Sequence, residues 1–202
     1  NRHTDEDWRD MLANNFKHYS VQVLGDRVMY HMELENIKKA CPQTITDAIN
    51  WWDDCVAWQH ELMGVKKYYD RWNDLMMAKD GYEEMFMYAT EGYTYYEHYT
   101  LPDILPWAKV YDSPGNMWGP AHEIGHMHQG AINIVTCTEV TNNLFANAHL
   151  FRAGKCTSRG KGLSTCIEDF TNKIPYPSRN DVFSKTRLYH QLYLYFHAAE
   201  KD

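Results

Sequence analysis

Apolar and polar residues alternate or recur along this chain in ways that predict short strands and longer helices. Residues 20–30 are typical of two short strands joined by a turn at Gly25 and Asp26. Over residues 47–63 the apolar positions follow helical spacing, which predicts a helix that Gly64 ends. Residues 85–89 and 92–96 are predicted to form two further extended segments.

Helices are expected to dominate the second half of the chain. Prolines and a Pro-Gly pair punctuate residues 102–119 and predict a loop region there. Pro120 suits the first position of a helix, where its missing N–H costs nothing, and Gly130 suits the end of that helix. In the rest of the chain, a helix is predicted over residues 138–151, a loop over residues 154–165 and a last helix over residues 181–199.

Length, composition and charge narrow the class of protein. A chain of 202 residues suggests one domain or one and a part, and 44% hydrophobic with 23% charged residues is ordinary for a soluble globular protein. The net charge of -7 and the lack of a long basic run indicate that nucleic acid is not a partner. No apolar stretch reaches the ~18 residues that a membrane-spanning helix needs.

The N-terminal segment is expected to be polar or a linker over residues 1–19, with the folded domain over residues 20–202. The chain begins at Asn1, so we interpret it as a piece of a longer protein, and no signal peptide is present from which to predict a compartment. Its five cysteines cannot all pair, and Cys156 and Cys166 are expected either to be bridged or to be free thiols.

The sequence His-Glu-Ile-Gly-His at residues 122–126 is an HExxH motif on the helix that Pro120 is expected to open. Residues four apart lie one turn apart on one helix face, so the imidazoles of His122 and His126 can reach one Zn²⁺. Glu123 projects beside the metal, where it can act as general base on metal-bound water. The motif therefore predicts a zinc hydrolase, against the alternative of two ordinary histidines on a polar face.

A catalytic zinc usually has three protein ligands and a water, so a ligand beyond the motif is expected. His128 lies only two residues after His126 and is predicted to point away from the metal. Glu139, at the start of the next predicted helix, is the better candidate. It fits a capping box with Thr136 equally well, and the residues alone leave these two interpretations open.

Two asparagines follow Glu139 on the same predicted helix. Asn143 is four residues further on and so shares its face, where it could bind the free ring nitrogen of a ligating histidine. Asn142 competes for that role, and either could be exposed to solvent. A side chain that stabilises the oxyanion is also expected, and tyrosines and histidines at residues 88–99 and 189–197 supply candidates without singling one out.

Two stretches together resemble a known family. Residues 118–129 (WGPAHEIGHMHQ) followed by residues 137–145 (CTEVTNNLF) are similar to the peptidase M60-like family, the enhancin-like gluzincins, in which a metal-binding glutamate follows the HExxH motif after a variable spacer. The resemblance implies three zinc ligands and a catalytic base, namely His122, His126 and Glu139 with Glu123.

The resemblance also implies a thermolysin-like α+β fold, with a small mixed sheet packed on the HExxH helix and the helices after it, and without the C-terminal parts of full-length members. It implies secretion or display at the cell surface, and glycoprotein substrates that often carry O-linked glycans. The 15 Tyr, 7 Trp and 7 Phe are compatible with glycan contacts, although a tyrosine-rich core would account for them as well. Gly92, Tyr93 and Trp118 are expected to bind substrate.

Together these observations predict a zinc endopeptidase that cleaves O-glycosylated, mucin-like glycoproteins. The alternative is a protease-like module that binds glycans or glycopeptides without cutting them, which would have no need of Glu123. An aminopeptidase is disfavoured because no GAMEN-like segment precedes the motif. A structural zinc site is disfavoured because such a site needs four protein ligands and no open position.

Overall fold

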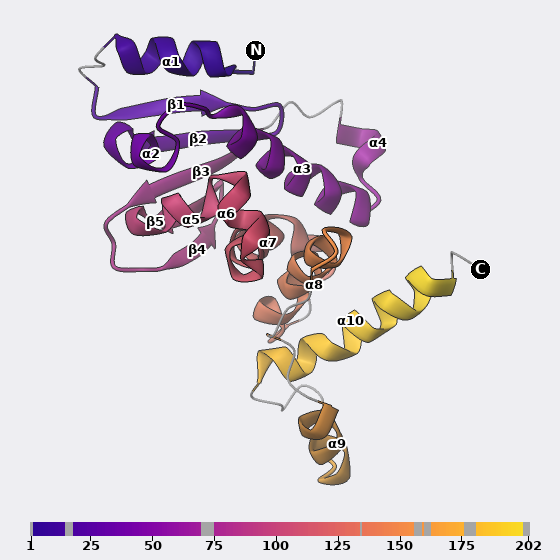
Figure 1. Cartoon of the computed structure of the whole chain (residues 1–202). Coiled ribbons are helices and arrows are strands. Elements are labelled where there is room, and N and C mark those ends of the chain that lie inside the picture. The colour runs from indigo at the N-terminus through magenta and orange to yellow at the C-terminus, as the bar shows by residue number, and fades with distance from the viewer. Residues whose placement is uncertain are drawn as a thin grey trace.

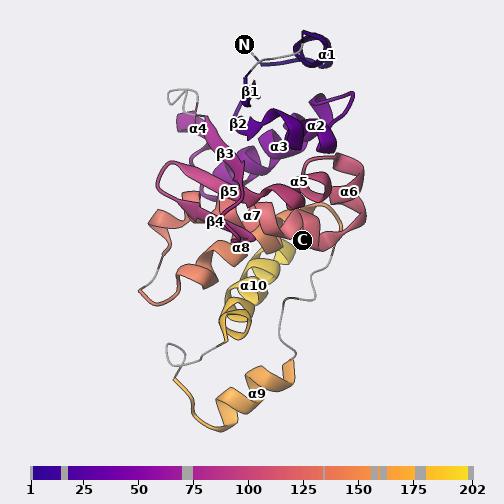
Figure 2. The same ribbon diagram turned by 90° about the vertical axis from the view of Figure 1, so that its left-hand side faces the viewer.

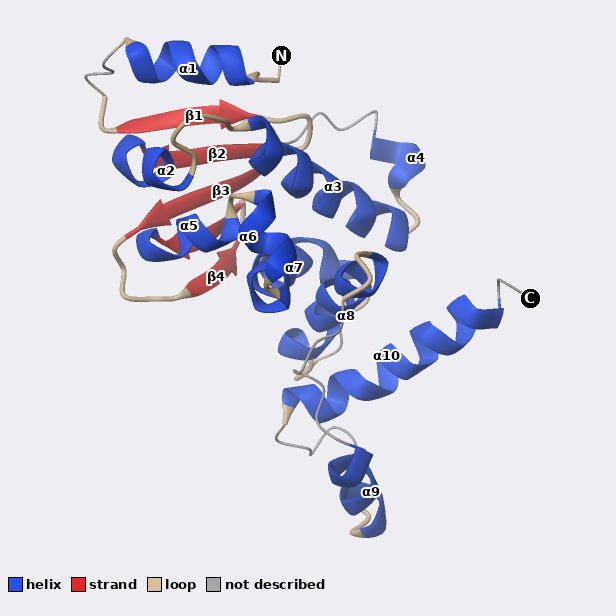
Figure 3. Ribbon diagram, in the orientation of Figure 1, coloured by secondary structure: helices blue, strands red, loops and turns tan. Residues whose placement is uncertain are grey.

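The protein is described by a computed structural model over residues 2–14, 18–69, 75–133, 135–155, 159, 163–175 and 181–199. Within these residues five strands form one mixed sheet, drawn in red in Figure 3. In spatial order the strands are β1 (Ser20–Leu24), β2 (Val28–Glu33), β3 (Met76–Gly81), β5 (Tyr93–Glu97) and β4 (Met87–Thr90).

The sheet combines two hairpins with a parallel centre. β1 pairs antiparallel with β2, β2 and β5 both pair parallel with β3, and β4 pairs antiparallel with β5. β4 is therefore an edge strand, with Tyr88 opposite Tyr95 in its only ladder within the described residues. In Figure 1 this edge is the one nearest to the helices of the second half of the chain.

Helices cover the sheet and extend beyond its β4 edge (Figure 1). α7 packs against α8 and β4, and α10 packs against α8. Figures 1 and 2 both show α9 and much of α10 lying away from the sheet. The helices are α1 (Asp5–Ala13), α2 (Leu34–Ala40), α3 (Thr46–Leu62), α4 (Lys66–Tyr69), α5 (Leu101–Ile104), α6 (Trp107–Asp112), α7 (Pro114–His128), α8 (Thr138–Arg152), α9 (Leu163–Thr171) and α10 (Val182–Ala199).

The core between the sheet and α3 is built on aromatic rings. Trp52 of α3 packs edge-on against Tyr30 of β2 at 5.5 Å and Tyr96 of β5 at 5.1 Å between ring centroids. All three side chains are fully buried. Edge-to-face pairs of this kind add roughly 0.5–1.5 kcal/mol each beyond the area they bury, so they fix α3 firmly on the sheet.

A buried carboxylate ties α3 to the turn between β1 and β2. Asp53 accepts backbone N–H bonds from Asp26, Arg27 and Val28 at 2.8–3.0 Å. Burial raises the pKa of Asp53, while these three bonds act in the opposite direction. A Cβ atom at Gly25 would lie 2.7 Å from the carboxylate, so this position needs glycine because of the close approach.

Much of the predicted pattern is confirmed. The hairpin over residues 20–30, the helix over 47–63, the strands near 85–96 and the helices over 138–151 and 181–199 all appear, within a few residues of the predicted bounds. The α+β fold class is confirmed as well, with a mixed sheet packed against the helix that carries the HExxH motif.

The prediction of a loop over residues 102–119 is wrong. α5 and α6 lie there, and α7 already begins at Pro114. Prolines punctuate this stretch because they occupy first turns and caps of helices, where no N–H partner is needed, rather than because they break structure. Pro120 consequently lies inside α7 instead of opening it, and α7 ends at His128, before the 3₁₀ turn Gln129–Ala131.

The first nineteen residues also differ from the polar or linker segment that was expected. They contain α1, which starts with a capping box between Thr4 and Asp7. Trp8 of this helix is fully buried, and its indole N–H donates to the carbonyl of Cys41 at 2.8 Å. Met11 and Leu12 also pack against the core, and Asp5 accepts hydrogen bonds from Ile45 and Thr46, so α1 is part of the domain.

Cys41, Cys55 and Cys137 are buried free thiols. Cys156 lies outside the described residues, so the two alternatives for it and Cys166, a bridge or free thiols, both stay open. Among the helices that the structure describes, none is both long and apolar enough to cross a membrane.

Candidate metal centre

Two neighbouring helices supply the side chains of the HExxH region. α7 carries the motif, and α8 carries Glu139 and the asparagines that follow it. The helices approach closely at Gly125, where a Cβ atom would lie 2.8 Å from the backbone oxygen of Asn142. Glycine at this position of the motif therefore lets the backbone of α8 come next to the two histidines.

The structure brings His122, His126 and Glu139 together. The two oxygens of the Glu139 carboxylate lie 3.2 Å from Nε2 of His122 and 3.4 Å from Nε2 of His126. Hydrogen bonding with these two imidazoles, His122 first, holds the pKa of the Glu139 carboxyl well below its usual range. α8 is instead preceded by Cys137, with no side chain capping it, so the structure does not form the capping box that was the alternative for Glu139.

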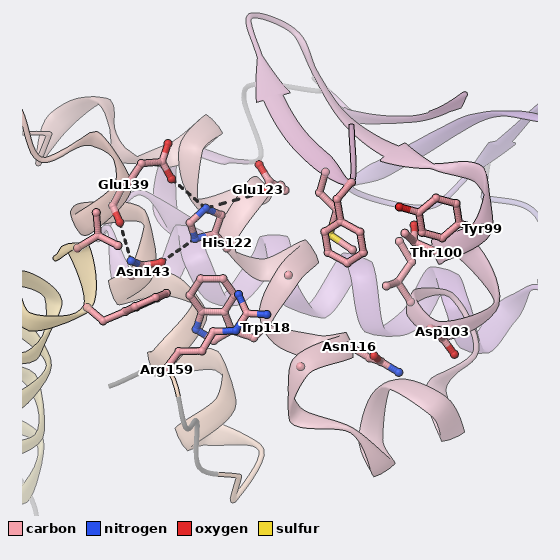
Figure 4. A pocket seen from close by; sticks show the side chains of 17 residues that line it. Tyr99, Thr100, Asp103, Asn116, Trp118, His122, Glu123, Glu139, Asn143 and Arg159 are labelled. Atoms are coloured by element: carbon pink, nitrogen blue, oxygen red, sulfur yellow. Dashed lines mark hydrogen bonds and ion pairs between the residues drawn. The ribbon is translucent and has the colours of Figure 1, made fainter. Parts of the chain in front are cut away.

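Glu123 faces the same point from the other side. Its carboxylate Oε1 is 4.0 Å from Nε2 of His122, and the residue is only 7% exposed. Burial raises the pKa of Glu123, and the nearby imidazoles of His122 and His126 act against that rise. Figure 4 shows the His122 ring between Glu123 and Glu139, with the two carboxylates on opposite sides.

Asn143 orients His122 from behind. Its Oδ1 lies 2.6 Å from Nδ1 of His122, so it accepts that N–H when Nε2 faces the metal (Figure 4). Its amide nitrogen donates to the carbonyl of Glu139 at 2.5 Å and to Oγ1 of Thr186 on α10 at 3.1 Å. The asparagine is thus fixed by two further bonds, which holds the ring in one orientation.

Asn142 also lies at this point rather than at the surface. Its amide nitrogen is 2.9 Å from Nε2 of His122 and 2.8 Å from Nε2 of His126. The side chain is fully buried, and among the described residues no hydrogen-bond partner reaches its Oδ1. A buried amide oxygen without a partner is costly, so the position of this side chain between the two imidazoles is not explained by its own hydrogen bonds.

Trp118 supports His122 through its ring. The two rings stack at 4.6 Å with 29° between their planes, and the indole N–H donates to Oδ1 of Asn147 at 3.0 Å. The guanidinium of Arg159 lies 4.2 Å over the indole. Trp118 lines a cavity beside the histidines, as its predicted substrate-binding role requires, but only 4% of it is exposed.

Gln129 is a residue of this site that the sequence alone did not single out. Its amide lies 2.7 Å from Nδ1 of His126, and Oγ1 of Thr141 donates to its Oε1 at 2.6 Å. The available signal was its position three residues after His126, one turn further along the helix. His128, by contrast, points away as expected, with Nδ1 donating to Oε1 of Gln59 at 2.8 Å.

Two cavities meet at His122, Glu123 and Glu139. One, of about 460 Å³, runs from His122 past Trp118 to Tyr99, Asp103 and Asn116. The other, of about 760 Å³, runs between α7 and residues 87–91 on and just after strand β4. Figure 4 shows the first cavity, with the glutamates at one end and Tyr99 at the other.

Two of the residues expected to bind substrate do not reach these cavities. Gly92 forms the turn before β5, with φ at +95°, and the half-buried Tyr93 lies on β5, which pairs with β3 and β4. The edge strand is β4, so residues from 87 onward face the histidines instead. Tyr88 and Tyr99 line the two cavities, although the hydroxyl of Tyr88 donates to Glu83 at 2.8 Å, and the partner for an oxyanion remains a prediction.

The donor set fits a divalent metal ion. His122, Glu123 and His126 offer ligand atoms that all lie within 4.8 Å of one another. Two ligands of one tetrahedral ion, each at ~2.0–2.1 Å, are separated by about 3.3 Å. The distances from Glu139 to the two imidazoles, 3.2 and 3.4 Å, match that separation, which fits Glu139 as the third ligand.

Comparisons with known proteins find metallopeptidases similar to this chain. A model of the peptidase M60 family, enhancin and enhancin-like, matches residues 1–186. A solved metallopeptidase in complex with Tn antigen is 32% identical, with a TM-score of 0.89 over 98% of this chain and 38% of its own. A metallopeptidase from Bacteroides thetaiotaomicron is 31% identical, with a TM-score of 0.88 over 98% and 35%.

A conserved protein of unknown function from Bacillus anthracis str. Ames is 24% identical, with a TM-score of 0.79, which shows a similar fold. It is covered over 41% of its length, so this chain spans well under half of each of these structures. No curated protein matches the chain.

Proposed function

The chain belongs to the peptidase M60 family, and we propose that it is a zinc-dependent endopeptidase that cleaves O-glycosylated, mucin-like glycoproteins. The observation that carries the proposal is the convergence of two imidazoles and the Glu139 carboxylate, with Glu123 facing the same point. His122, His126 and Glu139 would hold the ion, which supplies Lewis-acid chemistry and lowers the pKa of a water molecule.

Glu123 would move the proton. Its Oε1 takes a proton from the attacking water as the water oxygen bonds to the carbonyl carbon of the scissile peptide. The protonated Glu123 then gives that proton to the leaving nitrogen as the C–N bond breaks, so one water is consumed and one amine is released. Burial favours this role, because it raises the pKa of Glu123 toward the range in which a carboxylate can both accept and return a proton.

Two observations support a glycosylated substrate. A 32% identical metallopeptidase was solved in complex with Tn antigen, a glycan. The cavity of about 460 Å³ beside Glu123 has room for a sugar as well as peptide, and its lining mixes aromatic Tyr99 and Trp118 with polar Asp103 and Asn116. Since mucin-like glycoproteins are extracellular, the proposal also places the protein outside the cell or at its surface.

The test is cleavage of one glycopeptide under four conditions. An O-glycosylated mucin-type peptide and its deglycosylated form are incubated with the protein, each with zinc and with a chelator, and the products are followed by mass spectrometry. We expect cleavage only of the glycosylated form and only with zinc. Cleavage of both forms would remove the glycan preference and retain the peptidase.

The matched variants separate catalysis from binding. Glu123→Gln keeps the shape of the site and removes the base, so we expect the cleavage rate to fall at least 100-fold. Glu35→Gln makes the same change on the exposed face of α2 and is expected to cleave at the parent rate. A folded, zinc-loaded parent protein that binds the glycopeptide without cutting it would instead establish the binding module.

A further inference from the structure

We propose that Gln129 is the positioning residue for His126, and that Thr141 sets the direction in which its amide points. The proposal rests on the zinc site proposed above. It adds to that site a second support, so that a side-chain amide would contact Nδ1 of each imidazole, Asn143 at His122 and Gln129 at His126.

The geometry around Gln129 is that of a fixed group. Its amide lies 2.7 Å from Nδ1 of His126 on one side and 2.6 Å from Oγ1 of Thr141 on the other. Gln129 is 4% exposed and Thr141 is 1% exposed, so water does not compete for these bonds. The hydroxyl of Thr141 also lies 3.3 Å from the carbonyl of Cys137, which gives it a second partner.

The direction of these bonds follows from what a metal ligand requires. An imidazole that binds an ion through Nε2 keeps its proton on Nδ1, so Nδ1 must donate. The group that receives this proton has to be the oxygen of the Gln129 amide. Its nitrogen then donates to Oγ1 of Thr141, and the Thr141 hydroxyl donates to the carbonyl of Cys137.

Every donor in this chain meets an acceptor, and the chain ends on a backbone carbonyl at the start of α8. In the structure the amide nitrogen faces His126 and the amide oxygen accepts from Thr141. The two ends of an amide have nearly the same shape, so the zinc-bound form would make the same two contacts with the amide oxygen toward His126. Threonine suits this because its hydroxyl can serve either as donor or as acceptor to Gln129.

Asn143 shows the same arrangement for the other histidine. Its Oδ1 lies 2.6 Å from Nδ1 of His122, and its nitrogen is bound to the carbonyl of Glu139 and to Thr186. In both cases a buried amide lies between a ring nitrogen and a threonine hydroxyl. Asn143 contacts a backbone carbonyl itself, and Gln129 is linked to one through Thr141. Partners of metal-bound histidines of this kind typically change metal affinity 10–100-fold when removed.

The test measures zinc affinity of the folded protein by competition with a coloured chelator, which needs no substrate. Gln129→Met keeps the size of the side chain and removes the acceptor, so we expect zinc to bind 10–100-fold more weakly. Gln129→Glu keeps an acceptor toward His126 and is expected to restore affinity to within about threefold of the parent. Thr141→Val should weaken zinc binding and Thr141→Ser should restore it.

If Gln129 had only a structural role, its substitution would lower the stability of the protein without producing this pattern of zinc affinities. Gln59→Met removes another buried amide that contacts α7 but not a metal-facing imidazole, so it should destabilise the protein and change zinc affinity less than about threefold. Equal loss of affinity in Gln129→Met and Gln59→Met, or parent affinity in Gln129→Met, would overturn the proposal. A parent protein that binds no zinc would overturn the proposed function itself.

Discussion

A buried glutamine on α3 holds the helix that carries the HExxH motif, and removing it should destabilise the protein measurably. The Gln59 side chain is fully buried. Its amide nitrogen donates to the carbonyl of Ala121 at 2.8 Å, and its Oε1 accepts from Nδ1 of His128 at 2.8 Å. These two bonds join α3 to α7 just before and just after the motif, so we expect Gln59→Met to weaken the packing of α3 on α7.

The magnitude follows from the two bonds. Each contributes a net ~0.5–1.5 kcal/mol, and the His128 donor left buried without a partner costs about 1–3 kcal/mol more. Ala121 keeps its bond within the helix, and methionine fills nearly the same volume, so no cavity is added. We therefore expect the free energy of unfolding to fall by about 3 kcal/mol, which lowers a urea midpoint by roughly 1–1.5 M at an m-value of ~2–3 kcal/mol/M.

The assay is urea unfolding followed by tryptophan fluorescence. Gln22→Met, the same change at an exposed position on β1, should stay within about 0.5 kcal/mol of the parent. His128→Phe removes the stranded donor, so the double variant should lose at least ~1 kcal/mol less than the sum of the two single losses. A loss below about 1 kcal/mol for Gln59→Met, or additive losses, would refute the reasoning.

Three further predictions concern packing, pH and metal. Gly125→Ala puts a Cβ 2.8 Å from the backbone of Asn142, so the helices must separate at a cost of ~1–3 kcal/mol, whereas Gly119→Ala meets the flexible end of one methionine and should cost less in the same thermal scan. Burial lowers the pKa of His128 to about 3 and that of His149 to about 4. The unfolded chain therefore binds a proton at each of these histidines before the folded chain does. As the pH falls from 6 to 4, the free energy of unfolding should decrease by up to ~1.4 kcal/mol per pH unit for each histidine. An unchanged slope in His149→Gln would contradict this. Zinc at one hundred times its Kd should raise the free energy of unfolding by about 2.7 kcal/mol, a chelator should reverse the rise, and an unfolding curve indifferent to zinc would contradict the metal site.

The parts of the site that could be predicted are those set by local spacing. His122 and His126 share a helix face because they are four residues apart, and this holds wherever the helix begins. The sequence allows two roles for Glu139, metal ligand or member of a capping box, because glutamate serves in both. Only the packing of α8 on α7, which depends on Gly125, decides between them.

The parts that could not be predicted depend on contacts far apart in sequence. Proline chemistry is the same at a helix start and in a loop, so the sequence did not place the start of α7 at Pro114. Trp8 makes α1 part of the core through a contact with Cys41 that no local pattern encodes. Which of two adjacent strands forms the edge of a sheet depends on the strand order, and no local pattern shows that β4, rather than the strand of Tyr93, is the edge.

The groups that face the proposed ion and the amides that contact its ligands lie within residues 122–143. The widest direct contact between an amide and a ligand's ring, from Asn143 to His122, spans 21 positions, whereas the contact from Asn36 to Asp80 that joins α2 to the sheet spans 44, and Thr186 joins Asn143 from 43 positions away. Closing a short loop costs little entropy, so a helical hairpin can form before the parallel strands have paired. Zinc present during refolding should therefore accelerate folding itself, as well as slow unfolding, because its ligands are gathered early in the reaction.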